Sequence, residues 1–145
     1  AGEGLINRRR RSGTTVASPP ASHAMLDILS IPDEVRRLGQ VYGYDILSRQ
    51  DGRPSAELAE RFALKRTRPV AHLSLLHRGS GQPHVLEERV IHLDTVPDAA
   101  TERFATTPPG DWLLQNSLWS QAEHAISAVA AASADAVLLG IAPGE

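Results

Sequence analysis

The sequence predicts an α+β domain built on an antiparallel sheet with flanking helices. Hydrophobic residues make up 41% of the 145 residues, which is enough to form one packed core. Segments with helical spacing of apolar residues are mixed with segments in which apolar and polar residues alternate. The strand-like segments follow one another through turn sequences rather than through long helical crossovers, which favours antiparallel pairing.

Four strands are expected in the body of the chain. The clearest pair covers residues 69–77 and 84–93, joined by a connection over 78–83 whose glycines supply the positive φ values of a turn. A strand is also expected over 41–48 and another over 123–132, because apolar and polar residues alternate there.

Helices are expected where apolar residues recur on one face or where capping residues stand. Serine is a favoured N-cap, glycine a favoured stop, and acidic residues suit a first turn. The expected helices are 25–39 with a fresh start at Pro32, 54–64 with Ser55 as cap, 96–105, a turn from Asp111 to Leu114 after a loop over 106–110, and 133–139 with Ser133 as cap and Gly140 as stop.

The front end of the chain differs in charge from the rest. Four arginines and one glutamate give residues 1–17 a net charge of +3, so the other residues carry −5 of the total of −2. A basic tip on an acidic body indicates that the front end contacts a polyanion. The chain does not begin with Met and ends without a closing element, so we interpret both ends as truncations and leave open whether the fragment folds alone.

Several classes of protein are disfavoured by composition. The absence of cysteine excludes disulfides and thiolate metal sites and fits the reducing cytoplasm, where we expect the protein. No signal peptide is visible, and the most apolar stretch, 125–142, is interrupted by serine and aspartate, so no membrane association is expected. The six histidines show no spacing typical of a metal site, and we expect neither a metal nor a cofactor.

The front of the chain is predicted to be a β-hairpin with a basic tip. Residues 5–6 are apolar, 8–11 are arginines, 12–13 form a turn sequence and 14–16 are β-prone. Arginine side chains suit phosphate contact because their planar guanidinium groups stay charged. Residues 18–24 contain two prolines and read as a stiff linker between this hairpin and a domain over 25–145.

A polar cluster is expected on the hairpin formed by 69–77 and 84–93. Alternation places His77 on one face of the first strand and Glu87 and Arg89 on one face of the second. A tight turn would bring these faces together, so that Arg89 could bind a carboxylate and Glu87 could accept an N–H. The simpler alternative is that Glu87 and Arg89 pair with each other on a solvated face.

The motif from Gly4 to Ala17, Gly-Leu-Ile-Asn, four arginines and Ser-Gly-Thr-Thr-Val-Ala, resembles the end of a GntR-family winged helix, with Thr15 where that family usually has an aromatic residue. The resemblance implies that this remnant is the wing of a DNA-binding domain whose other parts lie upstream. It implies contact with operator DNA by Arg8, Arg9, Arg10, Arg11, Ser12, Gly13 and Thr14.

The remainder, from Met25 onward, resembles a UTRA domain, an effector-sensing module with a chorismate-lyase-like fold. The motif that carries this resemblance is Gln-Pro-His-Val-Leu-Glu-Glu-Arg at 82–89, and the stretches 109–114, 122–128 and 139–145 resemble the histidine-utilisation branch. The resemblance implies an effector bound at positions matching His77 and Glu87, a homodimeric repressor rather than an enzyme, and a urocanate-like effector.

Two alternatives stay open. A sugar-phosphate sensor of the same family usually carries arginines where Leu75 and His77 stand, so it ranks lower. A small chorismate-lyase-like enzyme or binding module without a DNA role is the other. Ser80 lies in no nucleophile motif, and a DNA-binding wing has no evident use in a lyase.

Overall fold

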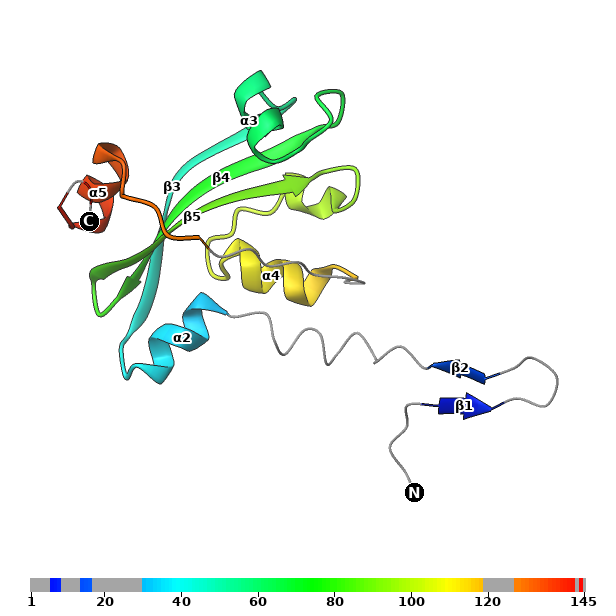
Figure 1. Ribbon diagram of the computed structural model, residues 1–145, viewed down its shortest axis with the longest axis horizontal. Coiled ribbons are helices and arrows are strands. Elements are labelled where there is room, and N and C mark those ends of the chain that lie inside the picture. The colour runs from blue at the N-terminus through cyan, green and yellow to red at the C-terminus, as the bar shows by residue number, and fades with distance from the viewer. Residues whose placement is uncertain (1–5, 9–13, 17–29, 119–126, 143, 145) are drawn as a thin grey trace.

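The computed structural model describes residues 6–8, 14–16, 30–118, 127–142 and 144. Its centre is a three-stranded antiparallel sheet in the order β3-β4-β5, as Figure 1 shows. The strands are β3 (Tyr42–Gly52), β4 (Val70–Gly79) and β5 (Gln82–His92). The predicted α+β class with an antiparallel sheet and flanking helices is therefore confirmed.

The turn between β4 and β5 is tighter than the sequence predicts. Only Ser80 and Gly81 lie outside the strands, and both have positive φ, 50° and 84°. Such a two-residue turn matches the twist of the strands it joins. Arg78 and Pro83, which were expected in the connection, are instead paired with each other across the two strands. The pairing shifts by one residue between Arg78 and His77, so that His77 lies opposite Val85.

Two short helices begin where serine caps them. Helix α2 (Ile31–Arg37) begins after Ser30, whose Oγ accepts a hydrogen bond from the Asp33 backbone N–H. Helix α3 (Ala56–Arg61) begins after Ser55, whose Oγ accepts from the Leu58 N–H at 3.1 Å. The predicted start near Pro32 and the predicted Ser55 cap are both confirmed, while residues 25–29 lie outside the described part.

The helix expected over 96–105 is wrong. The structure has only the 3-10 helix η1 (Pro97–Ala100) there. A few residues later Phe104 adopts a φ of 52° and inserts its ring into the core with 1% of its surface exposed. A left-handed residue cannot continue a helix, so burial of this one ring overrides the helical pattern of the sequence.

Three further elements match the prediction only in part. Helix α4 (Pro109–Asn116) begins two residues earlier than expected, because proline suits the first helical position. Helix α5 (Ser133–Leu139) has the predicted bounds, and Gly140 ends it at φ 69° as predicted, but Ser133 is its first residue rather than its cap. The described part of the expected strand 123–132, residues 127–132, has no ladder partner and is largely exposed, and 119–126 lie outside the described residues.

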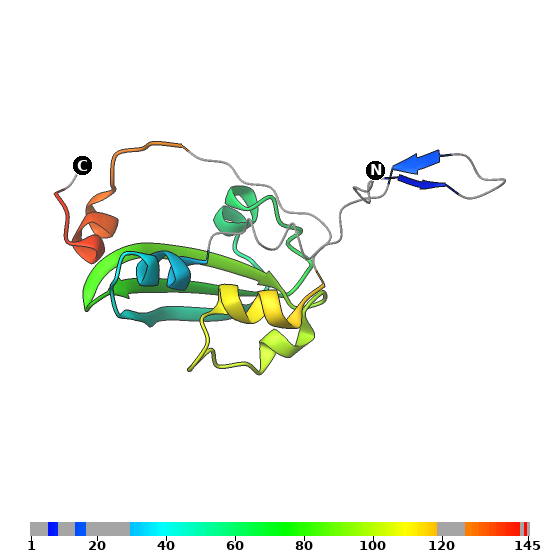
Figure 2. The same cartoon turned by 90° about the horizontal axis from the view of Figure 1, so that it is seen from below.

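The helices cover both faces of the sheet. Figure 2 shows α4 on one side of the sheet and α3 and α5 on the other. The main core lies on the α4 side, where odd-numbered β4 side chains pack against η1, α4 and the segment between them. Its buried residues are Ala71, Leu73, Leu75, Ile91, Ala99, Phe104 and Leu113.

The N-terminal hairpin is present as two strands, β1 (Ile6–Arg8) and β2 (Thr14–Val16). They pair antiparallel with Ile6 opposite Val16. The tip residues 9–13, the linker 18–24 and the other residues of 17–29 lie outside the described part. The pairing fits the predicted hairpin, while the division of the chain into wing, linker and sensor stays a prediction.

Replacing Leu73 with Ala should destabilise the domain. The side chain is fully buried at the centre of the core, so its loss leaves a cavity. We expect the free energy of unfolding to fall by about 2–5 kcal/mol in a urea titration. Leu47→Ala, at a position 41% exposed, should change it by less than about 0.5 kcal/mol. Equal effects of the two substitutions would contradict this description of the core.

Candidate functional site

The register of β4 and β5 brings three predicted site residues together. His77 lies opposite Val85, Leu75 opposite Glu87, and Leu73 opposite Arg89. Directly opposed residues of an antiparallel pair point to the same face of the sheet. His77, Glu87 and Arg89 therefore extend from the same face as the core, at its polar end.

His77 is the buried centre of this cluster, with 1% of its surface exposed. Its Nδ1 lies 2.8 Å from the Tyr42 hydroxyl, and its Nε2 lies 2.7 Å from Glu87 Oε2. Burial, and next the negative charge of Asp111, raise the pKa of Tyr42 well above its usual value, so this group keeps its proton. A neutral imidazole satisfies the pattern, with Nδ1 accepting from Tyr42 and Nε2–H donating to Glu87.

Glu87 is held as a carboxylate by two donors. Burial alone would raise its pKa, but the hydrogen bond from His77 and the charge of Arg89 outweigh this and leave the pKa below its ordinary value. The Arg89 Nε donates to Glu87 Oε1. The two residues do pair, as the simpler alternative has it. The face is not solvated, however, because only 11% of the Glu87 side chain is exposed.

A small cavity of about 70 Å³ opens in front of these residues, with room for roughly five water molecules. It lies between the sheet, the start of α2 and the start of α4. Gly110 at the start of α4 approaches Arg89 so closely that a Cβ there would lie 3.1 Å from Arg89 Nη2. The lining residues are Ser30, Ile31, Pro32, His77, Glu87, Arg89, Pro108, Gly110, Asp111 and Leu114.

Three polar residues of this site were not found by sequence reasoning: Ser30, Tyr42 and Asp111. The Ser30 hydroxyl donates to Asp111 Oδ1 at 3.2 Å, and 81 residues separate the two. Burial raises the pKa of Asp111 and the nearby Asp33 carboxylate adds to this, against the opposing effect of the hydrogen bond from Ser30. The sequence signals were a capping serine and an acid in a first helical turn, which indicate helix ends rather than a shared cavity.

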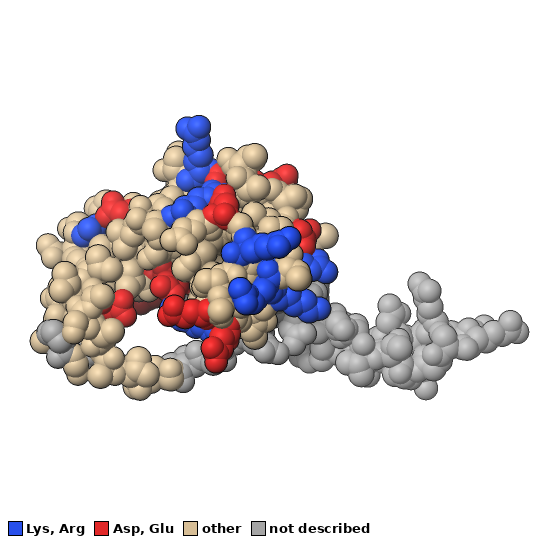
Figure 3. Space-filling model, turned by 90° about the horizontal axis from the view of Figure 1, so that it is seen from above, with Lys and Arg blue, Asp and Glu red and all other residues tan. Residues whose placement is uncertain are grey.

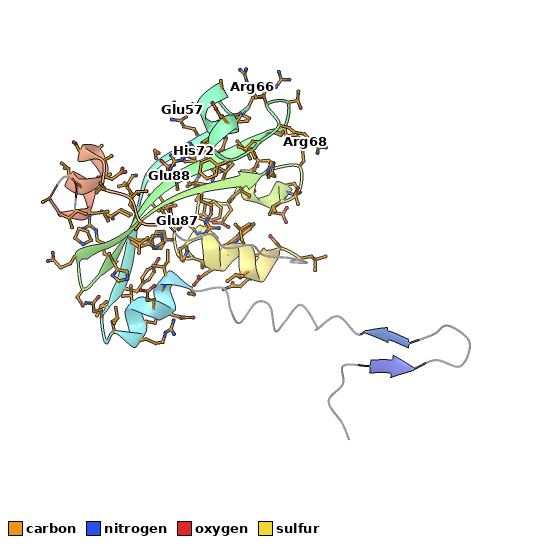
Figure 4. The ribbon with its side chains drawn as sticks, in the orientation of Figure 1. Glu57, Arg66, Arg68, His72, Glu87 and Glu88 are labelled. Atoms are coloured by element: carbon orange, nitrogen blue, oxygen red, sulfur yellow. The ribbon has the colours of Figure 1, made fainter. Side chains whose placement is uncertain are left out.

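The opposite face of the sheet carries different polar residues. His72 and Glu88 point toward α3, whereas Glu87 points away from it, as Figure 4 shows. Glu88 forms an ion pair with Arg61 of α3. Within the described ranges, no three His, Asp or Glu side chains lie close enough together to hold a metal ion. No helix in the part of the chain that the structure describes is long and apolar enough to cross a membrane.

The residues expected to contact DNA are placed only in part. Arg8 ends β1 and Thr14 begins β2, opposite each other in the hairpin. Arg9, Arg10, Arg11, Ser12 and Gly13 lie outside the described residues.

Comparison with known proteins gives consistent matches. A family model described as the UTRA domain matches residues 37–145. The histidine utilization repressor of Pseudomonas putida is 26% identical over 143 residues, which are 99% of this chain and 58% of that protein. The corresponding repressor of Klebsiella aerogenes is 26% identical over 139 residues, 96% of this chain and 58% of that protein. The chain thus spans less than two thirds of the length of these relatives.

Two solved structures share the fold. The C-terminal domain of the histidine utilization repressor from Pseudomonas syringae pv. tomato has a TM-score of 0.62 and 20% identity, covering 70% of this chain and 72% of that one. PhnF from Mycobacterium smegmatis has a TM-score of 0.66 and 19% identity, covering 97% of this chain and 62% of that one.

Replacing Glu87 with Gln should destabilise the domain in a pH-dependent way. The pKa of Glu87 is lower in the folded than in the unfolded chain, so the ionised carboxylate stabilises the fold above its ordinary pKa of 4.5. This stabilisation is lost as the pH falls through the folded pKa. We expect a loss of about 2 kcal/mol at pH 7 and a smaller loss near pH 3.5, from urea titrations across this range.

The matched control is Glu88→Gln on the opposite face, which removes the adjacent and more exposed carboxylate. Its effect should be smaller at pH 7 and should depend less on pH. A Glu87→Gln penalty that stays constant from pH 7 to pH 3.5 would mean that the charge of Glu87 does not stabilise the fold.

Proposed function

Because the chain belongs to the UTRA domain family, whose model matches residues 37–145, we propose that it is the effector-sensing part of a ligand-responsive repressor of transcription. The observation that carries this proposal is the polar cavity between the sheet and α2 and α4. There a buried His77–Glu87–Arg89 chain faces the start of α4. The relatives named as repressors support the same function.

The residues of the cavity suit a small carboxylic acid with a nitrogen-bearing group. The Arg89 Nε donates a hydrogen bond to Glu87, and its terminal nitrogen Nη2 faces the start of α4 at the cavity. A guanidinium edge binds a carboxylate in the same plane. We therefore propose Arg89 as the carboxylate-binding residue, with Glu87 and His77 at the polar floor. The relatives' role in histidine utilisation makes urocanate, a carboxylate joined to an imidazole, the first effector to test.

The proposed mechanism is a shift between two arrangements of a homodimer. An effector that binds one arrangement better than the other changes the spacing of the two DNA-binding units, and operator affinity falls. The hairpin at 1–17 would contact DNA through the arginines 8–11. On the face of the sensor in Figure 3, by contrast, basic and acidic side chains lie among one another. A repressor of this kind would act in the cytoplasm, without a cofactor or a membrane.

Two other functions rank lower. A sugar-phosphate sensor needs several cationic groups for a phosphate dianion, whereas Arg89 is the single arginine lining the described cavity. A lyase-like enzyme is disfavoured because the matched relatives are named repressors.

Urocanate at millimolar concentration should raise the thermal unfolding midpoint of the chain by several degrees. A ligand that binds only the folded state stabilises it, by about 2.7 kcal/mol at a hundredfold excess over its Kd. The rise should be lost in Arg89→Ala and retained in Arg78→Ala, since Arg78 pairs with Asp45 and does not line the cavity. A rise with glucosamine 6-phosphate instead of urocanate would favour the sugar-phosphate sensor. No rise with either ligand would contradict the proposed effector.

Replacing the four arginines 8–11 with alanine should weaken non-specific DNA binding by the chain. For every arginine that binds a phosphate in the wild type, its removal reduces the slope of log affinity against log salt concentration by about 0.9. The slope is measured by fluorescence anisotropy with a labelled duplex. Replacing Arg53 and Arg66, two exposed arginines of the sensor, should leave it unchanged. If the sensor variant lowers the slope and the hairpin variant does not, the hairpin is not the part that binds DNA.

A further inference from the structure

We propose that Asp111 is a second effector-binding carboxylate, and that an anionic effector binds in this cavity together with one proton. The inference rests on the proposed function, because it concerns the same cavity. It also narrows the chemical class of the effector. A small acid whose far end carries an imidazole or amine fits the site, whereas an acid without a nitrogen does not.

The free oxygen of Asp111 is the geometric basis of this proposal. Asp111 lies in the first turn of α4 and lines the cavity. Its Oδ1 accepts from Ser30, and its Oδ2 has no hydrogen-bond donor among the described residues. Both oxygens of Glu87, in contrast, are already occupied by His77 and Arg89. Asp111 therefore offers an acceptor that a ligand N–H can use without breaking the buried chain.

The lining of the cavity holds two carboxyl groups and one guanidinium group. Glu87 and Asp111 are the acidic residues that line it, and Arg89 is the one arginine. A ligand with one carboxylate would bring a third negative charge to a single guanidinium. Charges in a partly buried site interact much more strongly than in water, so binding with a proton removes most of this repulsion.

The groups around Asp111 indicate where this proton is held. Ser30 donates to Asp111 from the start of α2. Asp33 in the first turn of this helix forms an ion pair with Arg36 in its last turn. On the sheet side, Tyr42 and His77 are hydrogen-bonded to each other.

Asp111 is therefore the carboxylate that can take up the proton. Glu87 is kept ionised by its two donors. Burial is the largest influence on Asp111 and raises its pKa, and Asp33 adds to this, although the hydrogen bond from Ser30 and the charge of Arg36 oppose it. Among the described residues, no arginine forms an ion pair or hydrogen bond with Asp111. The proton is then shared between Asp111 and the nitrogen of the ligand, as in any closely coupled pair.

Isothermal titration of the chain with urocanate tests this proposal. Titrations between pH 7 and 8.5, above the range in which a free imidazole titrates, are run in phosphate and in Tris, whose heats of ionisation differ. We expect the binding heat to depend on the buffer in proportion to about one proton taken up. The affinity should then fall by up to tenfold per pH unit. Cinnamate, the same acid with a phenyl ring in place of imidazole, should bind at least tenfold more weakly.

Asp111→Asn keeps the size of the side chain and its bond to Ser30 but removes the charge. In this variant the buffer dependence and the pH slope should disappear, and urocanate should bind more tightly than to the wild type at pH 8.5. Asp33→Asn, which removes an exposed neighbouring charge outside the cavity, should keep the proton uptake.

The outcomes separate this inference from the proposed function. Urocanate binding without proton uptake, or with equal pH slopes in the wild type and Asp111→Asn, overturns the role of Asp111 and leaves the effector site in place. Equal affinities for urocanate and cinnamate would show that Asp111 does not bind a nitrogen of the ligand. No binding of urocanate at any pH overturns the proposed effector together with this inference.

Discussion

The pairing register of β4 and β5 is the constraint on which the cavity depends. Because side chains alternate across a strand, a slip of one residue would turn Glu87 and Arg89 to the α3 face and bring Glu88 to the cavity. The two-residue turn at Ser80 and Gly81 pairs Gly79 with Gln82. The register shift between His77 and Arg78 then moves the pairing by one residue, so that Leu75 lies opposite Glu87 and Leu73 opposite Arg89. The turn and this irregularity together decide which polar groups meet at the cavity.

Once the register is fixed, the buried polar groups must satisfy one another. An unpaired charge in this position would be costly. Tyr42, His77, Glu87 and Arg89 form a continuous chain of hydrogen bonds that meets this requirement. Because the chain is complete within the protein, Glu87 serves mainly to hold His77 and Arg89 in place. Among the described residues, the groups left for a ligand are the terminal nitrogens of Arg89 and the second oxygen of Asp111.

Features set by neighbouring residues in the sequence were predictable, and features set by distant contacts were not. Alternation located β4 and β5, and the capping serine at 55 located α3. Alternation placed Glu87 and Arg89 on one face of their strand. Their sharing that face with His77 also depends on the register shift between His77 and Arg78, which no sequence pattern indicated. The failed helix over 96–105 depends on where the Phe104 ring is buried. The contact of Ser30 with Asp111 depends on how α2 and α4 meet over the sheet, which no local pattern records.

The contact between Ser30 and Asp111 also bears on how a ligand could change the rest of the protein. Among the described residues it is the one side-chain hydrogen bond between α4 and the start of α2, and Ser30 also caps α2. A ligand shifts an equilibrium only by contacts that differ between two arrangements. A ligand N–H bound to Asp111 lies beside the oxygen that accepts from Ser30. The binding free energy of the ligand therefore depends on the position of the start of α2 relative to Asp111. Helix α2 is the first helix described after the hairpin and linker. A ligand that acts on the start of α2 would therefore act on the part of the domain that follows the basic end in the sequence.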